Sequence, residues 1–370
     1  MLSMRPNAIV LTILAIATLS CGGGGGGTPS GSGPGSPGSP TGSWQKMNAP
    51  PGATEVNFVA FNSSGHWFIA DRSQGFFRST DQGATWTQIN AGLPTTLGWT
   101  INVNPANGDL IASTATGGVL NANPVDFFRS TNEGNSWTLI PSGHLSAVTA
   151  LTGCVFAANT NIVCGGYWAP SPASGAWVST NGGQSTVSAT TASTNSGGVF
   201  SLGRNPVTQD LWLGTEQNGV FRSTDNGFTW TQESPSDQQI SDSDIYGITF
   251  DRNGNVLFAS QGGVWRSSTT NSGYTWTNVL SNPNVSAGKG LTRDANGNLY
   301  YGHDQDPSDP TDVYLSTDNG TTWAAFDSGI PPNLQGRQFT VNPSDHRLYA
   351  VITDEHTSSG WLYRTINPVQ

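Results

Sequence analysis

The sequence predicts an all-β fold, and three observations lead to that class. First, a phrase that runs from Ser79 to Trp86 recurs in near-copies whose starts lie 44 to 51 residues apart. The copies begin at Ser79, Ser130, Ser179, Ser223, Thr269 and Ser316. Second, an aromatic residue just before each copy recurs a seventh time. These aromatics are Phe77, Phe128, Trp177, Phe221, Trp265, Tyr314 and Tyr363. Third, only 10% of residues are charged while Gly, Ser, Thr and Asn abound, which suits short strands joined by turns. A period of about 47 residues matches one four-stranded blade, so we predict a seven-bladed β-propeller.

Four antiparallel strands can be placed in each unit, as the first unit shows. We expect them at 56–62, 66–71, 75–80 and 85–90, and we name them A to D. Turn residues recur between strands A and B, at 62–65, 104–108, 253–255, 296–298 and 342–345. Asn, Gly, Pro and Asp favour tight turns, so hairpins are expected at these places.

The last unit lacks its fourth strand, because nothing like Gly-x-Thr-Trp follows Tyr363. The missing piece stands at the other end of the chain, where 43–47 copies the pattern of 85–89 around Trp44. We therefore predict that this N-terminal strand closes the last blade and removes two open sheet edges.

The N-terminus predicts export. Residues 1–21 have a positive start at Arg5 and an apolar run over 8–19 that is too short to span a bilayer. Ser20 and Cys21 resemble the lipobox of bacterial lipoproteins, in which that cysteine is lipidated, although the leucine stands one place late, at Leu19. Ordinary secretion therefore stays open.

Residues 22–43 are almost only Gly, Ser, Pro and Thr and are expected to form a flexible linker ahead of a propeller at 44–370. Contact with a membrane is expected only through a lipid anchor.

The other two cysteines flank a turn at 159–161, and a hairpin centred there places Cys154 opposite Cys164. In an oxidising compartment these two residues can form a disulfide, and the alternative is a pair of buried free thiols.

The repeated phrase has a structural explanation. A short carboxylate or amide at its third position can accept backbone N–H bonds within the C–D turn, and the glycine can adopt the positive φ that the turn needs. We expect the residues at that position to be structural: Asp81, Asn132, Asn181, Asp225, Asn271 and Asp318. The phrase resembles the Asp-box, or bacterial neuraminidase repeat, of sialidase-like propellers, sortilin-type receptors, xyloglucanases and photosystem II assembly factors. Five copies match in full, while the copy at 179–186 lacks the Trp.

Charge and motifs exclude several functions. A net charge of −10 with only 14 Lys and Arg residues gives no basic surface for nucleic acid. No phosphate-binding glycine loop, nucleophile elbow or zinc spacing is present, so no cofactor is predicted.

The densest acidic segment carries Asp304, Asp306, Asp309 and Asp312. These oxygens are candidate Ca²⁺ ligands, but the segment lacks the Gly and final Glu of an EF-hand loop, which favours a solvated loop.

The B–C and D–A loops share the face opposite the boxes, and the resemblance to Asp-box propellers implies that a ligand binds on that face. Sialidases, whose repeat this one resembles, use three arginines to bind the carboxylate of the substrate. Here only Arg72 and Arg337 are expected to reach that face, so sialidase activity is not predicted. The candidate ligand-binding residues are Tyr167, Trp168, Tyr246, Asp304 and Arg337.

Three functions remain. The leading interpretation is a monomeric, non-catalytic propeller that binds or scaffolds a protein or glycan ligand. The alternative is a glycoside hydrolase, which needs two carboxylates on the ligand face. The candidate carboxylates are Asp71, Glu216, Asp244, Asp304 and Asp354. A photosystem II type of assembly factor ranks last, because the basic groove that this resemblance implies is hard to build from so few cations.

Overall fold

The computed structural model describes residues 43–114, 126–140, 150–167, 175–191, 198–233, 244–260, 262–270, 273–281, 288–303, 313–354 and 356–369. The predicted signal at 1–21 and all of the predicted linker except Ser43 lie outside this part. Every regular element in the described part is a strand, and none of its segments forms a helix able to span a membrane.

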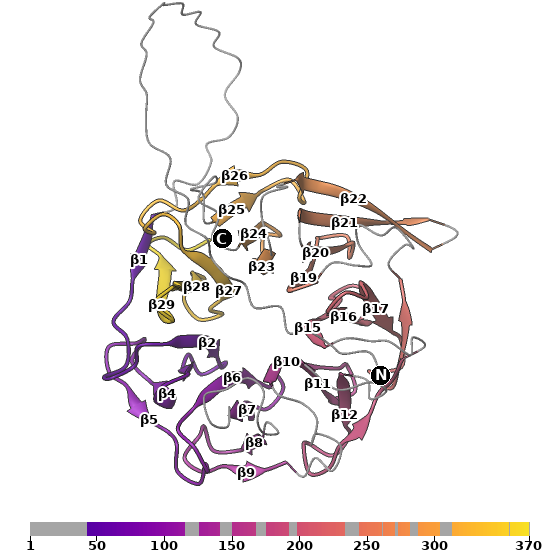
Figure 1. The fold of residues 1–370 in the computed structure, drawn as a ribbon. Helices are drawn as coiled ribbons and strands as arrows, with labels where there is room; N and C mark the ends of the chain where they lie inside the picture. Colours follow the sequence, from indigo (N-terminus) through magenta and orange to yellow (C-terminus); the bar gives the residue numbers. More distant parts are fainter. Residues whose placement is uncertain are drawn as a thin grey trace, which may run out of the picture. The chain divides into compact units, whose positions relative to one another are not determined.

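The strands form seven sheets, which confirms the predicted seven-bladed β-propeller (Figure 1). Blade 1 contains β2 (Val56–Phe61), β3 (Trp67–Asp71), β4 (Gly75–Ser79) and β5 (Thr87–Gln88). Blade 2 contains β6 (Gly98–Val103), β7 (Leu110–Thr114), β8 (Asp126–Ser130) and β9 (Thr138–Leu139). Blade 3 contains β10 (Ala150–Phe156), β11 (Ile162–Tyr167), β12 (Ala176–Ser179) and β13 (Val187–Ser188). Blade 4 contains β15 (Val199–Arg204), β16 (Leu211–Thr215), β17 (Val220–Ser223) and β18 (Thr229–Gln232).

The remaining blades follow the same order. Blade 5 contains β19 (Gly247–Phe250), β20 (Val256–Ser260), β21 (Gly263–Thr270) and β22 (Gly273–Ser281). Blade 6 contains β23 (Gly288–Arg293), β24 (Leu299–His303), β25 (Val313–Ser316) and β26 (Ala324–Ala325). Blade 7 contains β27 (Gln335–Val341), β28 (Leu348–Asp354), β29 (Ser359–Thr365) and β1 (Trp44–Lys46). A further short strand, β14 (Thr190–Thr191), pairs in parallel with the outer edge of blade 4.

The hydrophobic core is divided among the gaps between blades. In the described part each of seven buried clusters joins two neighbouring blades. One cluster packs Phe68 of blade 1 on Ile101 of blade 2, and another packs Trp67 of blade 1 on Tyr349 of blade 7. The ring therefore closes through side-chain packing, and β2, β6, β10, β15, β19, β23 and β27 contact one another in turn around the axis (Figure 1).

The N-terminal strand completes blade 7, as predicted. Trp44 pairs with Thr365, and Lys46 pairs with Tyr363. The indole Nε1–H of Trp44 donates to the carbonyl of Phe326 in blade 6 at 2.6 Å. Trp137 makes the equivalent bond from blade 2 to Ile89 of blade 1, also at 2.6 Å. Trp44 thus takes the place of a box tryptophan in blade 7, which has no box of its own.

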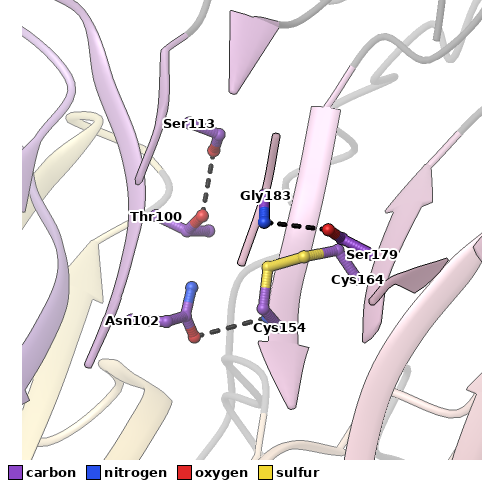
Figure 2. Close-up of a disulfide and its surroundings, with 7 residues drawn as sticks. All are labelled: Thr100, Asn102, Ser113, Cys154, Cys164, Ser179 and Gly183. Atoms are coloured by element: carbon purple, nitrogen blue, oxygen red, sulfur yellow. Dashed lines mark hydrogen bonds between the residues drawn. A yellow bond between two sulfur atoms is a disulfide. The ribbon is translucent and has the colours of Figure 1, made fainter. Parts of the chain in front are cut away.

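A disulfide joins β10 to β11 in blade 3. Cys154 and Cys164 are directly paired across the two strands, with an S–S distance of 1.99 Å and a Cα–Cα distance of 4.1 Å. The backbone N–H of Cys154 also donates to Oδ1 of Asn102 in blade 2 at 3.4 Å (Figure 2). The bridge therefore lies close to the contact between two blades.

Blade 5 departs from the repeat. The segment from Arg266 to Trp276 is two residues longer than the one from Arg78 to Trp86. The β21–β22 ladder extends to the pair Thr270 and Gly273, beyond the point where the other hairpins turn. Asn271, the predicted box residue of this blade, lies outside the described residues.

Candidate functional site

The repeated box folds into a self-contained turn. In blade 1 the buried Ser79 hydroxyl donates to Oδ1 of Asp81 and accepts the N–H of Gly83, both at 2.8 Å. Asp81 Oδ1 also accepts the N–H of Thr85 at 2.8 Å. Gly83 has a φ of 84°, and Gln82 before it has a φ of 59°, so two consecutive residues adopt the left-handed region. These bonds satisfy the polar groups of the turn without a ligand.

The boxes use two matched pairs of side chains. Asp81, Asp225 and Asp318 each accept the hydroxyl of a threonine four residues later. Asn132 and Asn181 instead donate their amide to a serine four residues later, at 2.8 Å. The side-chain hydroxyl and then the backbone N–H of Thr85 lower the pKa of Asp81 to about 2. For Asp225 and Asp318, partial burial would raise the pKa, but hydrogen bonds from Thr229 and Thr322 outweigh it and lower the pKa. All these groups stabilise turns.

Two of the predicted catalytic carboxylates also hold turns. Asp71 is buried and accepts hydrogen bonds from the backbone of Glu55, Ser73 and Gln74 and from the Ser73 hydroxyl, at 2.7–2.9 Å. Asp354 accepts the N–H of His356 and the hydroxyl of Thr357, both at 2.9 Å. These bonds give each carboxylate a structural task at the end of its strand.

A repeated feature marks the starts of the inner strands, at the end of the blades away from the box turns. In six of the seven inner strands the described register shifts by one residue near the start, as in a β-bulge. The bulged positions are Asn57, Trp99, Thr152, Phe200, Lys289 and Arg337. Each stands five residues before the first residue of the A–B turn, and in blade 5 Tyr246 holds that place. We call these seven residues the axial ring.

One side of the axial ring is acidic and aromatic. Tyr246 stacks on Phe200 with ring centroids 4.6 Å apart, and its hydroxyl donates to Asp244 Oδ2 at 3.0 Å. Burial raises the pKa of Glu216, and the charge of Asp244 raises it further, against a backbone hydrogen bond with Gly198 that lowers it. Two predicted carboxylates and one predicted aromatic residue are thus brought together from blades 4 and 5. We call Glu216, Asp244 and Tyr246 the acidic pole.

The other side is cationic and aromatic. The guanidinium carbons of Arg72 and Arg337 lie 4.8 Å and 5.9 Å from the ring centroid of Trp99. Nε of Arg72 also lies 3.8 Å from a carboxylate oxygen of Glu55. These side chains come from blades 7, 1 and 2, and such cation–π contacts fix the plane of a guanidinium. We call Arg72, Arg337 and Trp99 the cationic pole.

Several predicted residues cannot be placed. Trp168, Asp304, Asp306, Asp309, Asp312 and Cys21, and the side chain of Tyr167, lie outside the described residues. Within the described part no group of His, Cys, Asp and Glu is arranged to hold a metal ion. A shallow depression on the rim, between Lys46, Gln82 and Arg364, contains none of the predicted site residues.

The sequence did not single out Trp99, Phe200 or Asn57. The seven residues of the axial ring differ in chemistry, so no repeated residue type marks the position. The available signal was spacing, because each stands five residues before Asn62, Asn104, Ala157, Asn205, Asp251, Asp294 or Asn342. Most of these residues accept backbone hydrogen bonds in the A–B turn, which makes them the marker to count from.

Neither a family model nor a curated protein sequence matches the chain. Solved β-propellers do match. The structure of YCF48 bound to D1 peptide has a TM-score of 0.64 at 14% identity, with 88% of this chain and 97% of that chain covered. The GH74 xyloglucanase from Xanthomonas campestris has a TM-score of 0.61 at 15% identity, with 84% and 53% covered. The extracellular domain of BT4673 from B. thetaiotaomicron has a TM-score of 0.64 at 13% identity, with 87% and 39% covered. This chain therefore spans well under two thirds of the BT4673 and xyloglucanase chains, and these likenesses establish the propeller fold.

Proposed function

We propose that this protein is an exported, non-catalytic propeller of the Asp-box type that binds a protein or glycan ligand at the axial ring. Residues 1–21 serve as its export signal, Cys21 as its lipid anchor and residues 22–43 as its linker. One observation carries the proposal: three half-buried aromatic rings lie at the same end of the inner strands. Trp99 and Phe200 stand at bulges, and Tyr246 stands at the equivalent position of blade 5. Partly exposed aromatic rings beside charged groups are typical of binding sites.

The arrangement of the box supports this choice of face. Box turns satisfy their own polar groups, whereas the axial ring varies from blade to blade. Variable residues on a rigid scaffold are where recognition usually develops. Among the similar structures, the one of YCF48 contains a bound peptide, while BT4673 contributes an extracellular domain.

Array binding tests the proposal. The full chain is applied to a glycan array and an immobilised peptide array, beside the variants Trp99→Ala and Tyr246→Ala. We expect the wild type to bind a defined subset of probes and both variants to lose at least about tenfold in affinity, or about 1.4 kcal/mol. Phe228→Ala is the matched control, because it removes an exposed aromatic ring from a box turn. Unchanged binding by both axial variants contradicts the proposal.

A glycoside hydrolase is the second candidate, because Glu216 and Asp244 form a carboxylate pair. A carboxyl group whose pKa is raised by burial and by a neighbouring carboxylate is the kind of group that acid catalysis of glycosidic cleavage uses. Release of reducing ends from a panel of neutral and acidic polysaccharides distinguishes the two functions. Hydrolysis that falls at least about a hundredfold in Glu216→Gln favours the enzyme. No hydrolysis by a wild type that binds the arrays favours the binding module.

A further inference from the structure

The residues around the axial ring carry opposite charges on its two sides. The cationic pole belongs to blades 7, 1 and 2, and the acidic pole belongs to blades 4 and 5. In a ring of seven blades these two groups stand on opposite sides, with blade 3 between them on one path and blade 6 on the other. Figure 1 shows the inner strands β27, β2 and β6 across the axis from β15 and β19. A ligand laid across the axis therefore meets opposite charges at its two ends.

The cationic pole suits a carboxylate. A guanidinium stacked on an aromatic ring keeps its N–H donors in its own plane, where they match the two oxygens of a carboxylate. The guanidinium carbons of Arg72 and Arg337 both lie within 6 Å of the Trp99 ring centroid, so two guanidinium groups lie beside one indole, with Glu55 3.8 Å from Nε of Arg72. Two arginines beside one indole form a local cationic site in a chain with a net charge of −10.

The acidic pole suits an ammonium or guanidinium group. Glu216 and Asp244 supply carboxylates, and the stacked rings of Tyr246 and Phe200 supply faces that attract cations. Within the described residues Oδ1 of Asp244 is buried and has no hydrogen-bond partner. Buried carboxylate oxygens normally have a donor, so this oxygen leaves unused acceptor capacity at the acidic pole.

Charge separates the possible ligand classes. A neutral glycan needs neither pole. A polyanionic glycan is repelled by the acidic pole and by the net charge of −10. A peptide segment with acidic residues at one end and basic residues at the other is complementary to both poles, and its extended backbone spans about 3.3 Å per residue.

We propose that the axial ring binds an extended peptide of mixed charge, with its acidic end on Arg72 and Arg337 and its basic end on Glu216 and Asp244. This inference rests on the proposed function, since it names the ligand class for the same site. The two poles also give specificity, because a reversed charge at either end places like charges in contact.

Four fluorescent synthetic peptides of about ten residues test the inference on the full chain. One carries an acidic and a basic end, one is all acidic, one is all basic and one is neutral. We expect the mixed-charge peptide to bind at least about tenfold more tightly than the others, and this preference to weaken as salt screens the poles. Equal or tighter binding of the neutral or all-acidic peptide overturns the inference.

Neutralising one pole at a time provides the sharper test. Arg72→Gln with Arg337→Gln should shift the preference to the all-basic peptide, and Glu216→Gln with Asp244→Asn should shift it to the all-acidic one. Arg347→Gln is the matched control, because it removes an arginine of the A–B turn on the opposite face. Mixed-charge binding that survives both pole variants overturns the inference. Glycan binding at the axial ring without any peptide binding also overturns it, yet leaves the proposed function standing.

Discussion

At the residue scale, the box is organised around one buried serine hydroxyl. Ser79, Ser130, Ser179, Ser223 and Ser316 each accept a glycine N–H at 2.8–2.9 Å and donate to the acidic or amide residue of the same turn. The same serine thus satisfies a buried donor and orients the residue that caps the turn. The repeated Asp or Asn at this position therefore reflects turn chemistry.

Removing that hydroxyl should destabilise the blade. Ser79→Ala leaves the buried N–H of Gly83 without its acceptor, and an unsatisfied buried donor costs about 1–3 kcal/mol. Thr80→Ala, at the exposed neighbouring position, is the control and should change the free energy of unfolding by less than about 0.5 kcal/mol. Denaturant unfolding of both variants measures the difference. Equal stability of the two variants would show that the hydroxyl has no such role.

Acid should weaken the boxes that contain aspartate. The pKa of Asp81 falls from 3.8 to about 2 in the folded state, so its stabilising contribution is complete above pH 3.8 and is lost as the pH falls through about 2. The double variant Asp81→Asn with Thr85→Ser copies the box of blade 2, which has no carboxylate at this position. We expect its thermal midpoint to fall less than that of the wild type between these pH values. Parallel curves for the two proteins would contradict this assignment.

At the element scale, β1 acts as the missing outer strand of blade 7. Trp44 is buried against Phe326 and Phe339, and its indole bonds to blade 6. The strand therefore links the two ends of the chain and one further blade. Blade 5 shows the opposite case, because its longer C–D hairpin extends the ladder past the place of the box turn.

Removal of the Trp44 side chain should weaken the closure of the propeller. Trp44→Ala removes a buried aromatic side chain, which costs about 3–5 kcal/mol. Gln45→Ala changes an exposed residue in the same strand and keeps its backbone pairing with Arg364, so it should be close to neutral. Thermal unfolding compares them, and limited proteolysis after residue 47 reports release of the strand. A Trp44→Ala protein as stable as Gln45→Ala would refute the closure role.

At the scale of the whole molecule, the sequence predicted the blade count and the closure because both follow from a repeated period. Trp44 and Tyr363 could be matched by pattern alone, although they stand at opposite ends of the chain. The candidate site was less accessible. Asp71 was grouped with possible catalytic residues, but its turn bonds to Ser73 and Gln74 are local and could have been recognised.

The remaining features depend on tertiary structure. Glu216 and Asp244 come from different blades, and their electrostatic interaction follows from how those blades pack. The two arginines come from blades 1 and 7, and both lie near Trp99 at the bulge of β6 in blade 2. The axial ring has a different residue in each blade, so no repeated residue type marks it in the sequence. It can be recognised only when the inner strands are aligned on their A–B turns.

Stability belongs to the box face and recognition to the axial ring, and one comparison of variants tests this division. Binding to the arrays is measured for the wild type, for the box variant Ser79→Ala and for the axial double variant Arg337→Ala with Tyr246→Ala. The temperature is kept below the thermal midpoint of each protein. We predict that the box variant keeps the wild-type binding pattern and that the axial variant loses it. Loss of binding in the box variant, with binding retained in the axial variant, would contradict this division between the two faces.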